Sequence, residues 1–231
     1  MTVYQSLKAV AALRRGRATR VLESVAVKPV PDDHIPPVLK AVSSQIGTMI
    51  QLQLLTGMRP DEVTIMRPGD IDRSGDIWVY RPHTHKTEHY GIDKLILLGP
   101  KAQEVLRPWL ERDPAAYLFS PKEVWEAKLA SRRRDAKVAR PRKRKRRRAA
   151  RPPRDHYNDE GYCQAVERAC KRAGVPKWTP GRLRHNAGTK VRAKYGAEAA
   201  QLVLGHQNLS TTEIYAEKNR KRYEEIMKEI G

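Results

Sequence analysis

The sequence is poor in aromatic residues and cysteine, and it has no long apolar run. Only 6% of its 231 residues are aromatic, with a single Phe, so aliphatic side chains must build most of a core. Cys163 and Cys170 fit neither a CxxC metal motif nor a disulfide framework, and we interpret them as reduced and partly buried on one helix. No stretch suits a membrane helix or a signal peptide. These absences argue against secreted and membrane classes and favour a cytoplasmic protein.

Acidic residues are scarce relative to basic ones, and the imbalance is concentrated in one segment. The chain holds 46 Lys and Arg against 26 Asp and Glu, for a net charge of +20. Residues 132–154 alone contain 14 basic residues and one acid, Asp135, which leaves 32 bases and 25 acids elsewhere. Such a charge predicts a polyanionic partner, and nucleic acid is the most common one.

The basic segment contains an uninterrupted cationic run. Its members are Arg142, Lys143, Arg144, Lys145, Arg146, Arg147 and Arg148. Because like charges repel, we expect this run to be disordered until it meets phosphate. We interpret it as a non-specific, salt-dependent contact to a nucleic-acid backbone, with a merely solvated insert loop as the alternative.

Apolar periodicity predicts a mainly α-helical α+β fold with a small three-stranded antiparallel sheet. Two β segments, 76–80 and 94–98, flank residues 81–91, which we interpret as a strand leading into a hairpin turn at Tyr90-Gly91. The predicted helices cover residues 3–15, 34–42 after a turn and cap at 30–33, 46–56, 59–63, 103–112, 122–138, 158–173, 181–195, 197–204 and 218–230.

The hairpin region carries two histidines and a lysine. His83 and His85 would lie on one side of a strand and could form a metal pair, but no cysteine or carboxylate with suitable spacing completes that site. Polar residues of an edge strand are therefore the favoured interpretation. For Lys86 at the tip of this basic hairpin, taken alone, a solvated charge is the favoured interpretation.

Near its end the chain predicts a helix that stops at Gly205, a polar loop, and a short helix that begins at Ser210. This arrangement supports His206 and Tyr215 on two rigid elements. A tyrosine hydroxyl beside proton carriers can act as a covalent nucleophile. From these residues alone, an ordinary helix-turn-helix with a half-buried tyrosine is the favoured alternative.

Taken together, these motifs resemble the catalytic domain of tyrosine recombinases, the phage integrase family. The matching pieces are residues 54–63 (LLTGMRPDEV), Lys86-Thr87, Leu183-Arg184-His185, Leu204-Gly205-His206 and residues 211–216 (TTEIYA). The resemblance covers about residues 30–217, interrupted by the basic segment, and implies the tyrosine recombinase catalytic-domain fold. Each piece is weak alone, but their common order is specific.

The resemblance implies a role for each of five residues. Arg59 and Arg184 would grip the non-bridging oxygens of a DNA phosphate, since a planar guanidinium can bond bidentately. Lys86 would protonate the departing 5′ oxygen, and His206 would hydrogen-bond the scissile phosphate. Tyr215 would be the nucleophile and hold a 3′-phosphotyrosyl bond. No metal or other cofactor is implied, because the arginines supply the positive charge.

Three supporting positions qualify this assignment. Glu62, three residues after Arg59, matches an acidic position of the family and would orient its neighbours. Gly181 stands where the family usually has His or Lys, three residues before Arg184, so we expect weakened cleavage. His185 is frequent in the family, but it would occupy a different helix face, where we expect it to pack.

The resemblance also implies an organisation and a function. Residues 1–28 would be a helix and connector, a remnant of an N-terminal core-binding domain, and residues 29–231 the catalytic domain, with a disordered insert at about 132–155. The implied function is a site-specific recombinase acting on double-stranded DNA as a homotetramer, nucleoid-associated in the cytoplasm, with helix 218–230 packing on its own domain or a neighbouring subunit. The alternative is a non-catalytic DNA-binding remnant; a type IB topoisomerase or an RNA-associated protein fits the motifs less well.

Overall fold

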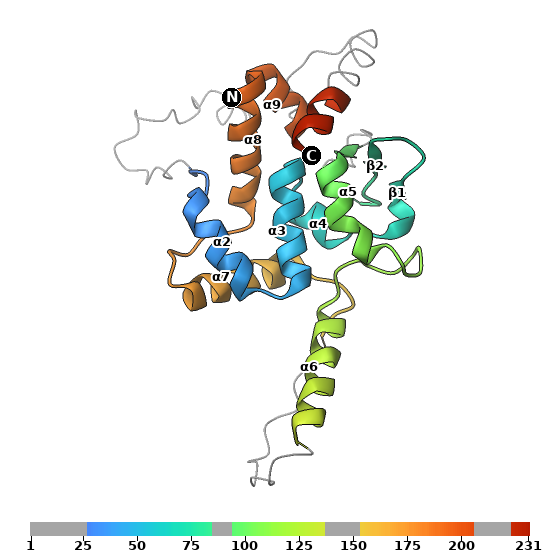
Figure 1. The fold of residues 1–231 in the computed structure, drawn as a ribbon, viewed down its shortest axis with the longest axis vertical. Helices are drawn as coiled ribbons and strands as arrows, with labels where there is room; N and C mark the ends of the chain where they lie inside the picture. Colours follow the sequence, from blue (N-terminus) through green and yellow to red (C-terminus); the bar gives the residue numbers. More distant parts are fainter. Residues whose placement is uncertain (1–26, 85–93, 137–152, 206–222) are drawn as a thin grey trace, which may run out of the picture.

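The computed structural model describes residues 27–84, 94–136, 153–205 and 223–231, and the side chains of these residues except 133–136. Helices dominate, with one small sheet beside them (Figure 1). This confirms the predicted mainly α-helical α+β fold. The elements are α2 (Ile35–Ala41), α3 (Ser44–Thr56), α4 (Pro60–Thr64), β1 (Ile71–Asp72), β2 (Trp78–Tyr80), β3 (Ile96–Leu98), α5 (Pro100–Leu106), α6 (Pro121–Ala136), α7 (Asp159–Ala173), α8 (Gly181–Tyr195), α9 (Ala197–Leu204) and a terminal helix over residues 223–230.

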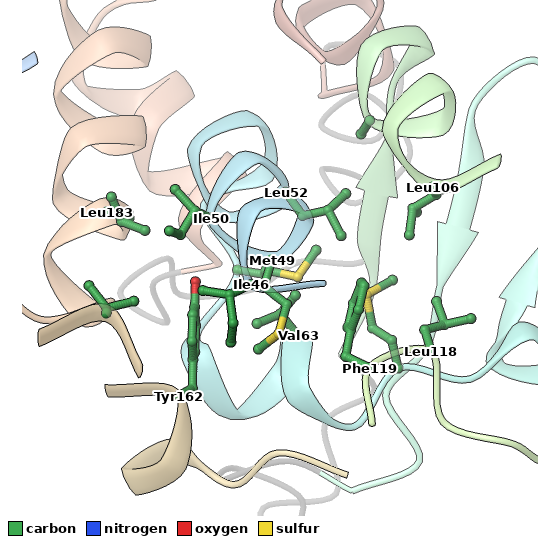
Figure 2. Packing of buried hydrophobic residues seen from close by; sticks show 14 of the residues in the cluster. Ile46, Met49, Ile50, Leu52, Val63, Leu106, Leu118, Phe119, Tyr162 and Leu183 are labelled. Atoms are coloured by element: carbon green, nitrogen blue, oxygen red, sulfur yellow. The ribbon is translucent and has the colours of Figure 1, made fainter. Parts of the chain in front are cut away.

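The core is built around α3. Figure 1 shows α3 at the centre, between α8 on one side and α5 on the other. Its side chains Met49, Ile50 and Leu52 are fully buried, and they meet residues of α4, α5, α7 and α8 (Figure 2). Truncating such a side chain, as in Leu52→Ala, costs about 2–5 kcal/mol of stability. The helix that leads to Arg59 is thus rigidly held.

Gly57 ends α3 in a conformation that other residues adopt poorly. Its φ is +69°, and its N–H bonds the carbonyl of Gln53. A Cβ at this position would also lie 2.8 Å from Cδ2 of Leu204, the last residue of α9. The predicted stop at Gly57 is confirmed, because the left-handed turn and the close approach of α9 both require glycine.

Helices α7, α8 and α9 follow the sequence prediction closely. Asn158 accepts a hydrogen bond from the Gly161 N–H at 2.9 Å and caps α7, which ends at Gly174 with φ +68°. Helix α9 ends at Gly205 with φ +61°. Cap residues and terminal glycines are local signals, so the sequence predicts these boundaries well.

The sheet has the order β1-β2-β3, and both pairs are antiparallel. Strands β2 and β3 lie inside the two predicted β segments, with Trp78 opposite Leu98 and Tyr80 opposite Ile96. The first strand, Ile71–Asp72, was not predicted, because two residues show no periodicity; it pairs with β2 through Ile71 and Tyr80. Residues 81–84 are not strand, and 85–91 lie outside the described residues.

Helix α5 differs from its predicted range of 103–112. It begins at Pro100, a residue suited to the first helical position, and gives way after Leu106 to a 3₁₀ turn over Arg107–Trp109. Pro108 explains the early end, because proline lacks the N–H and clashes with the preceding turn.

The terminal helix packs on its own domain. Tyr223, Ile226 and Met227 are buried against Val79, Leu97, Val191 and α9. The Ala102 N–H also donates to the Gly231 carbonyl at 2.6 Å. The sequence left open whether this helix packs on its own domain or on a neighbouring subunit, and residues 223–231 pack on their own domain.

Three further features bear on the sequence predictions. Cys163 is partly exposed and Cys170 buried, and both are free thiols, as predicted. Helix α6 projects away from the body (Figure 1) and exposes Trp125. Among the described residues, no helix is both long and apolar enough to cross a membrane.

Candidate functional site

Arg59 lies at the N-cap of α4, one turn before Glu62. Pro60 at the first helical position starts the helix, and Glu62 at the third closes a capping box. One oxygen of the Glu62 carboxylate accepts from the Arg59 backbone N–H at 2.7 Å, and the other accepts from Nη1 at 2.9 Å. The carboxylate is only 1% exposed, whereas the Arg59 side chain is 28% exposed. Glu62 therefore orients Arg59, whose side chain remains partly accessible.

Tyr80 fastens α4 to the sheet. Its hydroxyl donates to the Glu62 carbonyl at 2.7 Å, and its side chain is fully buried. Burial, followed by the negative charges of Asp70 and Glu62, raises the pKa of Tyr80 well above its ordinary value. The phenol therefore stays protonated and remains a hydrogen-bond donor at neutral pH. This contact couples the position of the Arg59–Glu62 turn to β2.

Arg184 joins the C-terminal ends of α3 and α9. Nη1 donates to the Gly57 carbonyl at 2.6 Å, and Nη2 donates to the Leu204 carbonyl. Both acceptors belong to helix ends, whose last carbonyls have no partner within the helix and attract cations. Leu183 and Ala187 are buried on either side of Arg184 in α8 and set its orientation. Arg184 is thus held at the junction by backbone groups.

A close approach of α8 and α9 makes this junction possible. A Cβ at Gly188 would lie 2.7 Å from Cδ1 of Leu204, so a larger residue in α8 would displace the Leu204 side chain. The carbonyl of the same residue, Leu204, accepts from Arg184.

The two arginines and Glu62 interact electrostatically. Burial lowers the pKa of Arg184, and the positive charge of Arg59 lowers it further, while Glu62 raises it. An arginine remains charged despite such a shift. The pair therefore forms a fixed concentration of positive charge with one buried carboxylate behind it, which is suited to holding a tetrahedral oxyanion such as a phosphate.

Lys94 is a further basic residue of the site that the sequence analysis did not single out. It stands two residues before β3, and a Cβ at Gly205 would lie 2.7 Å from its Nζ. Its surroundings include Glu62, Arg184 and Arg59. From the sequence, a lysine just before a strand is most simply interpreted as a solvated charge. The place of Lys94 in the site depends on the packing of α9 beside β3, which the sequence does not indicate.

Gly181 begins α8 and is exposed, with no atom of the described residues within 4 Å of a Cβ at that position. Because it precedes Arg184 by three residues, the two lie on one side of the helix. His185 is exposed, so the expectation that it packs is wrong. The adjacent residue, Asn186, is the one that faces inward.

Asn186 anchors the segment before α2, a role that the sequence did not indicate. Its side chain accepts from the Val30 N–H at 2.8 Å and donates to the Val30 carbonyl at 2.6 Å. His83 contacts Asp70 at 3.0 Å and is exposed. The remaining predicted site residues, Lys86, His206, Tyr215 and the cationic run 142–148, lie outside the described residues, as does His85.

This helical fold, with two arginines brought together at a helix junction, has the organisation of a tyrosine recombinase catalytic domain. The chain belongs to the phage integrase family, whose sequence profile matches residues 32–222. It is 30% identical over 186 residues to the tyrosine recombinase XerC of Bifidobacterium longum subsp. infantis. That match covers 76% of this chain and 44% of the relative, so the chain spans less than half the length of this relative.

Solved structures share the fold. The integrase from mycobacterium phage Brujita matches with a TM-score of 0.60 and 19% identity, over 92% of this chain and 60% of that one. A lambda integrase dimer bound to a COC′ core site matches with a TM-score of 0.52 and 17% identity, over 87% of this chain and 62% of that one.

Proposed function

We propose that this chain is the catalytic part of a site-specific DNA recombinase or integrase that cleaves and rejoins double-stranded DNA through a 3′-phosphotyrosyl intermediate. The observation that carries this proposal is the convergence of Arg59 and Arg184 from separate parts of the sequence, fixed by Glu62 and by the ends of α3 and α9. Family membership and the DNA-bound lambda integrase support DNA as the partner.

The chemistry follows from the residue types. The Tyr215 oxygen attacks the scissile phosphorus, a bond forms between them, and the bond to the 5′ oxygen breaks. Arg59 and Arg184 stabilise the negative charge that builds on the non-bridging oxygens. Lys86 gives a proton to the departing 5′ oxygen, and His206 hydrogen-bonds the phosphate. Attack by a 5′ hydroxyl reverses the steps and rejoins the strand, so no external energy source is consumed.

Gly181 favours a second candidate function, that of a non-catalytic DNA-binding remnant. Glycine can accept no proton, so the phenol proton of Tyr215 would have to leave to water or to another group. A general base contributes a factor on the order of 10² to 10⁴ in rate. The arrangement of Arg59, Glu62 and Arg184 favours an active enzyme, with a cleavage rate lowered by about the factor that a general base contributes.

Covalent capture separates the two candidates without knowledge of the target site. The protein is incubated with a pool of nicked duplexes that carry randomised inverted repeats, and DNA that stays linked to protein after denaturation is recovered and sequenced. A recombinase yields linked DNA that shares a common site and is lost in Tyr215→Phe and Arg184→Ala. DNA retention under native conditions, with no linked DNA in any variant, would identify the remnant.

Assembly on DNA belongs to the same proposal. Strand exchange needs two cleaved duplexes held together, and we propose a homotetramer on DNA. Mass photometry of the protein with a captured site then gives a complex of four chains and two duplexes. A single chain per duplex at all concentrations would contradict this.

A further inference from the structure

Lys94 lies at the edge of the site formed by Arg59 and Arg184, and it has no part in the chemistry proposed for that site. It begins the approach to β3, and α9 ends directly against it at Gly205. The same end of α9 provides the Leu204 carbonyl that binds Arg184. The lysine ammonium and the Arg184 guanidinium therefore meet at one helix end.

The charges around Lys94 do not balance within the described residues. Arg59, Arg184 and Lys94 are three cations, and Glu62 is the buried carboxylate among them. Both oxygens of Glu62 already bond Arg59, and Asp61 acts more weakly on Lys94 than either arginine. Crowding like charges in a partly buried site is unfavourable unless an anion joins them.

The pKa of Lys94 reflects its burial and this excess of positive charge. Burial lowers the pKa of Lys94, and the charges of Arg184 and Arg59 lower it further, against the opposing effect of Glu62. A bound anion would reverse those contributions, so the ammonium is poised to gain from a phosphate placed beside it.

The three cations also differ in how many of their N–H donors already make hydrogen bonds to the protein. Arg184 uses one N–H of each terminal nitrogen on backbone carbonyls, and Arg59 uses Nη1 on Glu62. An ammonium on a flexible stem has three donors that rotate to meet an acceptor, whereas the guanidinium has a fixed fork. Lys94 can thus follow the oxygens of a phosphate as its geometry changes during reaction.

We propose that Lys94 is a further catalytic residue, whose ammonium binds the scissile phosphate together with Arg59 and Arg184. This inference rests on the proposed recombinase function and adds a third described cation to its phosphate site. The competing explanation is structural: Lys94 would only hold the end of α9 at Gly205 and would not respond to an anion.

Lysine ¹³Cε NMR of the full chain, with inorganic phosphate as the probe, distinguishes the two explanations. Lys94→Gln identifies the resonance by its disappearance, and Lys40→Gln, at an exposed position of α2, is the matched control. We expect Lys94 to titrate below an ordinary lysine and its pKa to rise when phosphate is added, whereas phosphate should leave the position of the Lys40 resonance as it is. A rise of one pKa unit corresponds to about tenfold tighter phosphate binding by the charged form. A Lys94 resonance that phosphate does not move would overturn the proposal.

The covalent-capture assay gives a second readout. Removing one donor from an oxyanion site typically costs on the order of 10² in rate, so linked DNA should form about that much more slowly in Lys94→Gln. Lys94→Arg keeps the charge and should retain phosphate binding. If Lys94→Gln fails to fold, Lys94→Arg also lacks the Lys94 resonance and identifies it for the wild-type titration.

Failure of this inference differs from failure of the proposed function. Normal linked DNA in Lys94→Gln, with no phosphate response of Lys94, rejects the role of Lys94 and leaves the recombinase intact. No linked DNA from the unaltered protein, with a clear phosphate response, rejects strand cleavage and leaves Lys94 as a phosphate contact.

Discussion

The guanidinium of Arg184 donates to the Gly57 carbonyl at 2.6 Å, two residues before Arg59. Through this bond and the one to the Leu204 carbonyl, Arg184 helps to hold the backbone that positions Arg59. Arg184 therefore has a structural role in the described state as well as its proposed role on phosphate.

Replacing Arg184 should reduce stability as well as cleavage. Arg184→Lys keeps the charge but cannot span both carbonyls, so we expect the free energy of unfolding to fall by about 1.5–3 kcal/mol, the range for hydrogen bonds to charged groups. Urea denaturation measures this change. Arg192→Lys, at an exposed position of the same helix, serves as the control and should change stability little. Equal stability of the two variants would show that the carbonyl contacts are not needed.

Tyr80→Phe removes the hydroxyl that donates to Glu62 without removing the packed ring. A buried acceptor left without its donor costs about 1–3 kcal/mol, and we expect this loss in urea denaturation. Because the bond links β2 to the Arg59–Glu62 turn, covalent capture should weaken as well. Normal capture with lowered stability would confine Tyr80 to a structural role.

Stability should decline in alkali because buried tyrosines resist ionisation. Burial raises the pKa of Tyr223 from 10.0 to about 12. Below pH 10 the phenol is protonated in both folded and unfolded chains. Between about pH 10 and 12 only the unfolded chain releases the proton, so unfolding becomes easier by up to about 1.4 kcal/mol per pH unit.

Urea denaturation from pH 9 to 12 measures this slope. Tyr223→Phe should show a shallower decline over that interval than the unaltered chain. Tyr195→Phe is the comparison, since partial burial and the hydrogen bond to Glu229 raise the pKa of Tyr195 less than full burial raises that of Tyr223, so its removal should change the slope less. A decline that is identical in all three proteins would contradict the assignment.

Gly181→His should increase cleavage. The position is exposed, one turn before Arg184, and no atom of the described residues lies within 4 Å of a Cβ placed there. A general base contributes a factor on the order of 10² to 10⁴, and even partial placement should give about a tenfold faster rate of linked-DNA formation. Gly181→Ala controls for the higher helix propensity of a non-glycine residue. Equal rates for the His and Ala variants would show that the missing base is not the limiting feature.

The cationic run 142–148 should control the salt dependence of DNA binding. Each phosphate contact contributes about 0.9 to the slope of log affinity against log salt concentration. Replacing the seven basic residues by Gln and Ser should therefore lower that slope by up to about 6, measured by fluorescence anisotropy on a non-specific duplex. Sequence preference among captured sites should persist, because phosphate contacts carry no base information. An unchanged slope would favour the solvated-loop interpretation.

Local signals predicted the helical framework and part of the site. Gly57, Gly174 and Gly205 mark helix ends that the structure places at those residues. The short helix predicted over residues 59–63 corresponds to α4, which has Arg59 at its N-cap. Strand β1 escaped prediction because its two residues have no pattern. The role of Asn186 escaped because its partner Val30 is distant in sequence.

The position of Lys94 in the site was also not predicted, because the residues that it contacts are distant in sequence. What identifies it is the end of α9, brought next to β3 by packing rather than by any neighbouring residue. His185 was misplaced because its position beside Arg184 did not indicate which helix face is buried; Leu183 and Asn186 occupy that face. Tertiary contacts, not propensities, decide these positions.

The attachment point of captured DNA tests the central claim most directly. Linked protein is digested with nuclease and trypsin, and the peptide that retains a nucleotide is sequenced by mass spectrometry. Strand transfer through a 3′-phosphotyrosyl intermediate predicts a single modified residue, Tyr215, carrying a nucleotide through its 3′ phosphate. A nucleotide on another residue, or attached through its 5′ phosphate, would contradict the proposed function.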